Sequence, residues 1–134
     1  MKKSGSIQEF KEARDRELLA SFRHVLATAQ GVPLREMYGM AARRPCSRFW
    51  VSEERASEVM SRMMQGKDDE KMRPQRRRMY DEIRKRVDRK LREEPGMPLC
   101  HAVGEVVNSP APEFYLTDSS ALVIISRLRH ARRK

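Results

Sequence analysis

Residues 31–63 read GVPLREMYGMAARRPCSRFWVSEERASEVMSRM, and residues 96–128 read GMPLCHAVGEVVNSPAPEFYLTDSSALVIISRL. The two segments align without a gap at an offset of 65 residues, and 9 of their 33 positions are identical. The matching positions hold mainly glycines, prolines, aromatic residues and apolar residues. These residue types determine where helices end and which side chains form the core. Because a self-similar segment at a fixed offset is the signature of a repeat, the sequence predicts a tandem duplication.

Apolar residues at helical spacing predict the first helix of each half. The helix is expected over about residues 10–29 in the first half and over about residues 74–93 in the second. Its buried stripe is Leu18, Phe22, Val25, Leu26 and Ala29 in the first half, and Tyr80, Ile83, Val87 and Leu91 in the second.

Glycine and proline mark the next boundary in both halves. Gly31 and Gly96 are expected to end the first helix, because glycine accepts the left-handed conformation that closes a helix. Pro33 and Pro98 suit the first turn of a short second helix, where no amide hydrogen is missed.

An extended link and a third helix complete each half. The triplets Phe49-Trp50-Val51 and Phe114-Tyr115-Leu116 favour β-structure, and their pairing as a short two-stranded ribbon is a further hypothesis. Ser52 and Thr117 are expected N-caps of the third helix. The third helix carries an apolar stripe at matching positions, namely Ala56, Val59, Met60 and Met63, and Ala121, Ile124, Ile125 and Leu128.

The predicted fold is therefore all-α, with two three-helix units packed as a pseudo-twofold pair. The first unit is expected over residues 7–64 and the second over residues 74–130. A charged linker at 65–73 separates them, and a basic tail follows at 131–134.

Charge indicates the class of partner. The 134 residues include 29 Lys+Arg and 19 Asp+Glu, a net charge of +10, which favours polyanions and nucleic acid first. The sequence contains no run of 18 apolar residues, so we expect no membrane span. The lysines near the start of the sequence are not followed by an apolar segment, so we expect no secretory signal. Cys46 and Cys100 are read as reduced thiols, so a cytoplasmic location is expected.

Residues 71–92 hold the densest charge, with 11 basic and 3 acidic side chains. Phosphate contact through this helix is the favoured reading. A solvated helix with internal ion pairs, such as Asp81 with Lys85, is the alternative. The candidate nucleic-acid-binding residues are Arg76, Arg77, Arg78, Arg84, Lys85, Arg86, Arg89, Lys90, Arg129, Arg132, Arg133 and Lys134.

Trp50 and Tyr115 occupy equivalent positions before a helix N-cap, where they could stack on bases, although packing within the fold is the favoured reading. A helix-turn-helix comparison is limited by the link before the third helix, which is about eight residues long rather than a tight turn.

The sequence predicts no catalytic residues, metal site or cofactor. His24, His101 and His130 fall at unrelated positions of the repeat, and no Cys–His spacing supplies four zinc ligands. No glycine-rich phosphate loop or nucleophile elbow is present in the sequence.

The segment Phe49-Trp50-Val51-Ser52-Glu53, followed by Ala56, resembles small basic proteins of bacterial mobile elements and prophages. That resemblance implies no activity and assigns no functional residue. From the residues themselves we expect a nucleic-acid-binding accessory, architectural or regulatory protein, with DNA favoured over RNA. The alternative is a helical adaptor that binds another protein.

Overall fold

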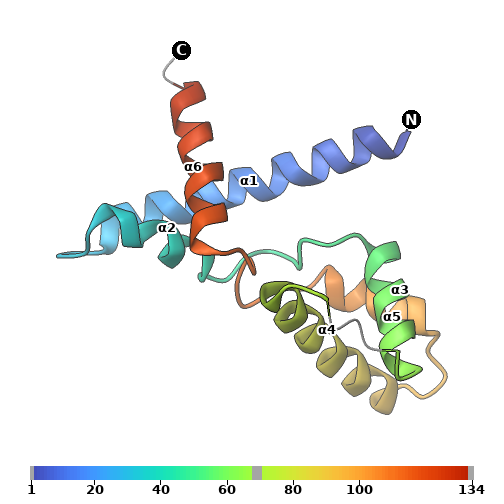
Figure 1. Ribbon diagram of the computed structural model, residues 1–134. Helices are drawn as coiled ribbons and strands as arrows, with labels where there is room; N and C mark the ends of the chain where they lie inside the picture. The colour runs from blue at the N-terminus through green and yellow to red at the C-terminus, as the bar shows by residue number, and fades with distance from the viewer. Residues whose placement is uncertain (1, 68–70, 133–134) are drawn as a thin grey trace. The chain divides into compact units, whose positions relative to one another are not determined.

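A computed structural model of the chain describes residues 2–67 and 71–132. These residues form helices without a β-strand, which confirms the all-α prediction (Figure 1). The helices are α1 (Lys2–Thr28), α2 (Leu34–Ala42), α3 (Glu53–Met64), α4 (Pro74–Glu93), α5 (Leu99–Val107) and α6 (Asp118–Arg132).

The helices group into two compact units that do not follow their order along the chain. Unit 1 comprises residues 1–46 and 112–134, and unit 2 comprises residues 47–111. In unit 1, α2 packs against α1 and α6, whereas in unit 2, α5 packs against α3 and α4. This grouping differs from the expected sequential units at 7–64 and 74–130, because each third helix packs on the short helix of the other sequence half.

The core of unit 1 follows the predicted stripe of α1. Leu18, Phe22 and Val25 are buried, and the Phe22 ring stacks on the Tyr38 ring of α2 with centroids 5.0 Å apart. Leu26 was also predicted to face the core, but it is 40% exposed. It lies in the last turn of α1, so the packed part of the stripe ends one turn earlier than the apolar pattern does.

The core of unit 2 is built on α4. Tyr80, Ile83 and Val87 are all buried, as their spacing predicts. Phe49 from the link before α3 is fully buried as well, and so is Met60 of α3. Burial of these side chains supplies the main stabilising term of a small helical unit.

The two aromatic triplets do not form the ribbon that was hypothesised. Instead, the Phe49 amide donates to the Val107 carbonyl at 3.0 Å, and the Phe114 amide donates to the Ala42 carbonyl at 2.9 Å. Val107 and Ala42 are the last residues of α5 and α2. Because the last carbonyls of a helix have no partner within it, each link satisfies a helix end rather than a strand.

The predicted helix boundaries are confirmed at the N-caps and only in part at the glycines. Ser52 Oγ accepts from the Arg55 amide at 3.1 Å, and Thr117 Oγ1 accepts from the Ser120 amide at 3.0 Å. Gly31 has the left-handed φ of 70°, as expected. Gly96 does not, and α4 ends at Glu93, three residues before it, with Glu94 at φ −133° and ψ 80° as the C-cap.

A second pair of equivalent contacts joins the start of each third helix to the end of a short helix. In unit 1, Arg43 forms an ion pair of 2.9 Å with Asp118. In unit 2, Asn108 Nδ2 donates to the Glu53 carboxylate at 2.9 Å. Asn108 and Glu53 lie at the offset of 65 from Arg43 and Asp118, so the contact recurs although the side chains differ.

Glycines make room for these acidic side chains. A methyl group at Gly39 of α2 would overlap the Asp118 carboxylate, and one at Gly104 of α5 would lie 2.9 Å from Glu53 Oε1. A side chain at either glycine would therefore require these carboxylates to move from their present contacts.

Candidate nucleic-acid interface

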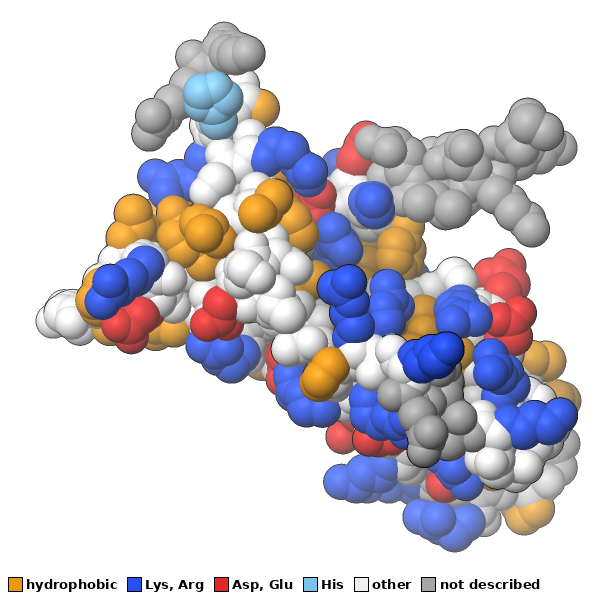
Figure 2. All heavy atoms as spheres, in the orientation of Figure 1, with side chains coloured by type: hydrophobic (Ala, Val, Ile, Leu, Met, Phe, Trp, Pro, Cys, Tyr) orange, Lys and Arg blue, Asp and Glu red, His pale blue; other side chains and the backbone are white. Residues whose placement is uncertain are grey.

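The positive charge of unit 2 is concentrated in one helix. Residues 47–111 contain 15 Lys+Arg and 12 Asp+Glu, and 11 of those basic residues lie in residues 71–92. Figure 2 shows many Lys and Arg side chains, with Asp and Glu side chains among them, in the lower right of the view, where α3, α4 and α5 lie in Figure 1. A nearly balanced unit therefore presents a strongly basic helix.

Four of these residues form an exposed stripe on α4. At 3.6 residues per turn, their positions fall within about 60° of one another and opposite the buried side chains, and they span about 21 Å along the axis. All four are exposed. The residues of this stripe are Arg78, Lys85, Arg89 and Arg92. Three of them were predicted site residues, and Arg92 extends the set.

Most of the stripe is available to an external anion. Lys85, Arg89 and Arg92 form no ion pair with any residue that the structure describes. The solvated-helix alternative is met in part. Asp81 and Lys85 form no ion pair in the described residues, whereas Glu82 pairs with Arg86 at 2.9 Å and Asp88 lies 3.7 Å from Arg84, both outside the stripe.

Other predicted residues of α4 are engaged inside unit 2. Arg84 donates to the Met63 carbonyl at 3.2 Å, and Lys90 pairs with Glu105 of α5 at 2.8 Å. Arg86 pairs with Glu82 at 2.9 Å, donates to the Pro110 carbonyl at 2.8 Å and places its guanidinium 5.1 Å from the Phe49 ring centroid. These three side chains hold helices and links together, which limits their freedom to meet a phosphate.

Two further predicted residues, Arg76 and Arg77, lie in the first turn of α4 and differ in exposure. Arg76 is exposed, whereas Arg77 is half-buried and lines a pocket between α3 and α4. We call this the α3–α4 pocket. Its volume, including the solvent at its mouth, is about 340 Å³, and its charged or polar lining is Arg55, Arg62, Lys67, Arg77, Tyr80 and Asp81.

The basic residues that α3 gives to this pocket were missed by sequence reasoning. Glu53, Glu54 and Glu58 surround Arg55 in the sequence, so α3 shows no run of positive charge. The spacing of seven residues between Arg55 and Arg62 places both on one face of α3, which is the signal that could have found them.

The predicted residues of the C-terminal helix belong to unit 1. Arg129 places its guanidinium 5.2 Å from the Phe22 ring centroid, and its neighbour Arg127 pairs with the buried Asp15 at 3.2 Å. The side chain of Arg132, and the residues Arg133 and Lys134, lie outside the described part of the chain.

The two aromatic candidates differ in backbone conformation. Trp50 is half-buried, its indole nitrogen is buried, and the Arg48 guanidinium lies 5.5 Å from a ring centroid of the indole. Tyr115 is half-buried with a left-handed φ of 58°. Burial and the cation over the ring favour packing over base stacking for Trp50.

The described residues offer no group of three His, Cys, Asp or Glu side chains that could hold a metal ion. Cys46 is buried and Cys100 exposed, and both are free thiols. None of the helices in the described ranges is long and apolar enough to cross a membrane.

The chain matches no protein-family model, and neither curated proteins nor solved structures give a significant match. Function is therefore argued from the residues alone.

Proposed function

We propose that this protein binds nucleic acid through phosphate contacts made by the exposed stripe of α4. The single observation that supports the proposal is the alignment of Arg78, Lys85, Arg89 and Arg92 on one solvent face of a rigid helix. Cationic side chains in such a row neutralise phosphates and release condensed counterions. Such contacts position a protein but carry no sequence information, so we propose an accessory or architectural role on DNA.

The test removes three positive charges that form no ion pair with a described residue. We expect the triple variant Lys85→Gln, Arg89→Gln and Arg92→Gln to bind a random DNA duplex at least about tenfold more weakly than the wild type. Its melting temperature should be unchanged. The slope of log affinity against log salt should fall in magnitude by about 3. A fluorescence-anisotropy titration at several salt concentrations measures both quantities.

A matched control removes the same charge elsewhere. Arg16, Arg23 and Arg35 are exposed side chains of unit 1, and changing all three to Gln alters the net charge equally. We expect a smaller loss of affinity for this control. Equal losses in the two triple variants would mean that net charge, rather than the α4 stripe, drives binding, and salt-independent binding would overturn the proposal.

A protein partner is the second candidate, and one observation favours it. Leu122 and Val123 of α6 are adjacent in the sequence and are 42% and 60% exposed. Exposed apolar neighbours suit a protein contact better than a phosphate contact. Leu122→Ser with Val123→Ser should leave DNA affinity unchanged if the α4 stripe is the nucleic-acid site.

We further propose that a tandem duplication produced the two units. The Phe49–Val107 and Phe114–Ala42 hydrogen bonds, and the Asn108–Glu53 and Arg43–Asp118 contacts, coincide when residue numbers are shifted by 65. A pseudo-twofold relation between the units is the arrangement that such reciprocal contacts favour. Its test is an experimental structure, in which rotation of one unit onto the other should superimpose these four contacts.

A further inference from the structure

Tyr80 buries its ring while its hydroxyl makes no hydrogen bond within the described residues. The residue is 1% exposed, and its hydroxyl oxygen is buried. Buried polar atoms without a partner are rare in folded proteins, and each one calls for an explanation such as a ligand. We propose that the α3–α4 pocket binds one phosphate group of the nucleic acid, an inference that rests on the proposed function.

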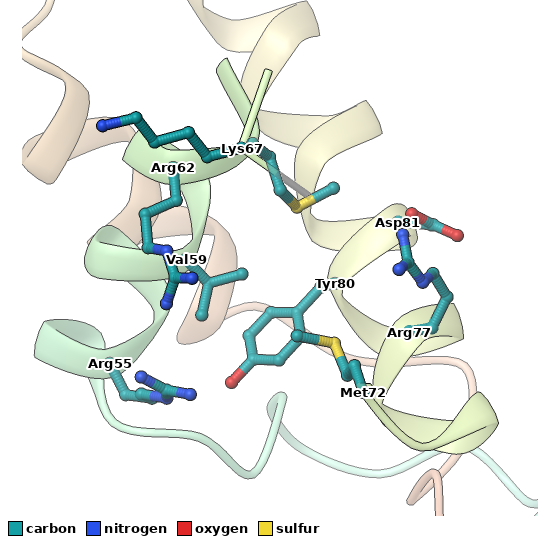
Figure 3. A pocket seen from close by; sticks show the side chains of 9 residues that line it. Arg55, Val59, Arg62, Lys67, Met72, Arg77, Tyr80 and Asp81 are labelled. Carbon is teal, nitrogen blue, oxygen red and sulfur yellow. The ribbon is translucent and has the colours of Figure 1, made fainter. Parts of the chain in front are cut away.

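The hydroxyl points toward the basic side of the pocket. Figure 3 shows the Tyr80 ring reaching from α4 toward α3, with its oxygen on the side where Arg55 and Arg62 extend. Arg77 turns toward Asp81 on the other side of the ring, and the Lys67 amine points away. The anion-binding groups are therefore two guanidiniums from α3 and one hydroxyl from α4.

Of these three groups, Arg62 is the cation whose charge is not paired within the described residues. It is exposed and forms no ion pair with a described residue. Arg55 donates to Glu58 at 2.7 Å, and this hydrogen bond is the main cause that raises the pKa of Arg55. Tyr80 also raises that pKa, through its charge and through its oxygen as an acceptor facing the Arg55 guanidinium, although the two groups do not meet the geometry of a formed hydrogen bond. Both guanidiniums remain charged at any physiological pH.

The chemistry of these groups matches a phosphate. A phosphate offers several acceptor oxygens and negative charge, whereas guanidinium and hydroxyl groups supply donors, and charged hydrogen bonds of this kind are the stronger ones. A phosphate oxygen within reach of the Tyr80 hydroxyl would provide the partner that the protein itself does not.

The first experiment uses inorganic phosphate and the full-length protein. Titration at constant ionic strength, followed by two-dimensional NMR, should shift the resonances of Tyr80 and Arg62 saturably. Tyr80→Phe removes only the hydroxyl, and Arg62→Gln removes only the free cation, so each should weaken phosphate binding about tenfold. Arg35→Gln, an exposed change of the same kind in unit 1, should leave the affinity unchanged.

The second experiment asks which phosphate of the nucleic acid occupies the pocket. Anisotropy titrations compare one duplex with and without a 5′-phosphate. If Tyr80→Phe weakens binding only to the phosphorylated duplex, the pocket binds a strand-end phosphate. If it weakens binding to both duplexes, the pocket binds a backbone phosphate.

Two results separate this inference from the function on which it rests. If Tyr80→Phe and Arg62→Gln bind both duplexes and inorganic phosphate as tightly as the wild type, the pocket site is overturned, while loss of binding in the α4 triple variant still supports the proposed function. If the wild type binds inorganic phosphate at Tyr80 but no duplex at low salt, the nucleic-acid function fails, and with it the assignment of the pocket to a nucleic-acid phosphate.

Discussion

Arg48 shows how a basic residue in a basic protein can serve the fold. Its guanidinium donates to the Phe49 carbonyl at 3.0 Å and to the Val51 carbonyl at 2.8 Å, and it lies over the Trp50 ring. Burial lowers the pKa of Arg48, and the charge of Glu53 opposes that shift. The side chain thus fixes the turn of the link that precedes α3.

At this scale the first prediction is that Arg48→Ala lowers the free energy of unfolding by about 2 kcal/mol, because two hydrogen bonds from a charged group are lost. Arg43→Ala is the control. Its pair with Asp118 joins side chains that are 57% and 65% exposed, so its loss should cost no more than about 1 kcal/mol. Urea denaturation measures both values, and equal losses would contradict the structural role of Arg48.

The second prediction concerns the hydroxyl of Tyr80. Because no described residue bonds to it, Tyr80→Phe should raise the free energy of unfolding by up to about 1 kcal/mol in phosphate-free buffer. A loss of stability in that buffer would show that the hydroxyl has a protein partner. The sequence could place Tyr80 on the core stripe of α4, but helical spacing carries no information about the atoms around its hydroxyl.

Helix ends are the features that the sequence predicted best, because their chemistry is local. The N-caps Ser52 and Thr117 act on neighbouring backbone amides, as predicted. Pro33 and Pro98 were expected in the first turn of the short helices, and they stand one residue earlier, at the N-cap positions of α2 and α5. The ribbon hypothesis was wrong because β-propensity depends on the side chain, whereas strand pairing depends on which backbone groups meet. The Phe49 and Phe114 amides donate instead to the carbonyls at the ends of α5 and α2.

The third prediction tests the caps. Ser52→Ala and Thr117→Ala should each lower the free energy of unfolding by about 1 kcal/mol, since each leaves a helix amide without its acceptor. Ser57→Ala, within α3, is the control and should change stability by less than about 0.5 kcal/mol. Thermal unfolding followed by circular dichroism compares the three variants.

The fourth prediction concerns the contact between α4 and α5. The hydrogen bond from Lys90 lowers the pKa of the Glu105 carboxyl below its usual 4.5, with the Lys90 charge acting in the same direction. Because the pKa of Glu105 is lower in the folded state, the pair with Lys90 stabilises the folded protein at pH values above the unfolded-state pKa. This stabilisation is lost as the pH falls through the folded-state pKa. Carbon-detected NMR titration should find the Glu105 pKa below 4.5, and Lys90→Met should return it toward that value.

At the scale of the whole molecule, the grouping of the helices was beyond sequence reasoning. The apolar stripe of α3 (Ala56, Val59 and Met60) and that of α6 (Ala121, Ile124 and Ile125) have the same spacing and similar size. Either helix therefore suits the groove of either short helix, and the pattern cannot distinguish a helix from its counterpart. The similarity between residues 31–63 and 96–128 helped to predict the helices, but it gives no information about which helix packs on which.

The fifth prediction follows from the grouping. A fragment of residues 47–111 contains all three helices of unit 2 and should unfold cooperatively, with the modest stability of a 65-residue domain. A fragment of residues 1–67, which is the first sequence half, lacks α6 and should not reproduce the packing of α2 on α6. Cooperative unfolding of the second fragment, with α3 seated on α2 by NMR, would contradict the grouping.

The exchange of third helices also orders events in time. During synthesis, residues 1–46 emerge before residues 47–111, yet α2 packs on α6, which begins at Asp118. Unit 2 is complete once Ala111 has left the ribosome, whereas unit 1 must wait for the residues of α6. Contacts between such distant segments form slowly, because the intervening chain must first be brought together. Residues 1–46 are thus synthesised before unit 2 but reach their final packing after it.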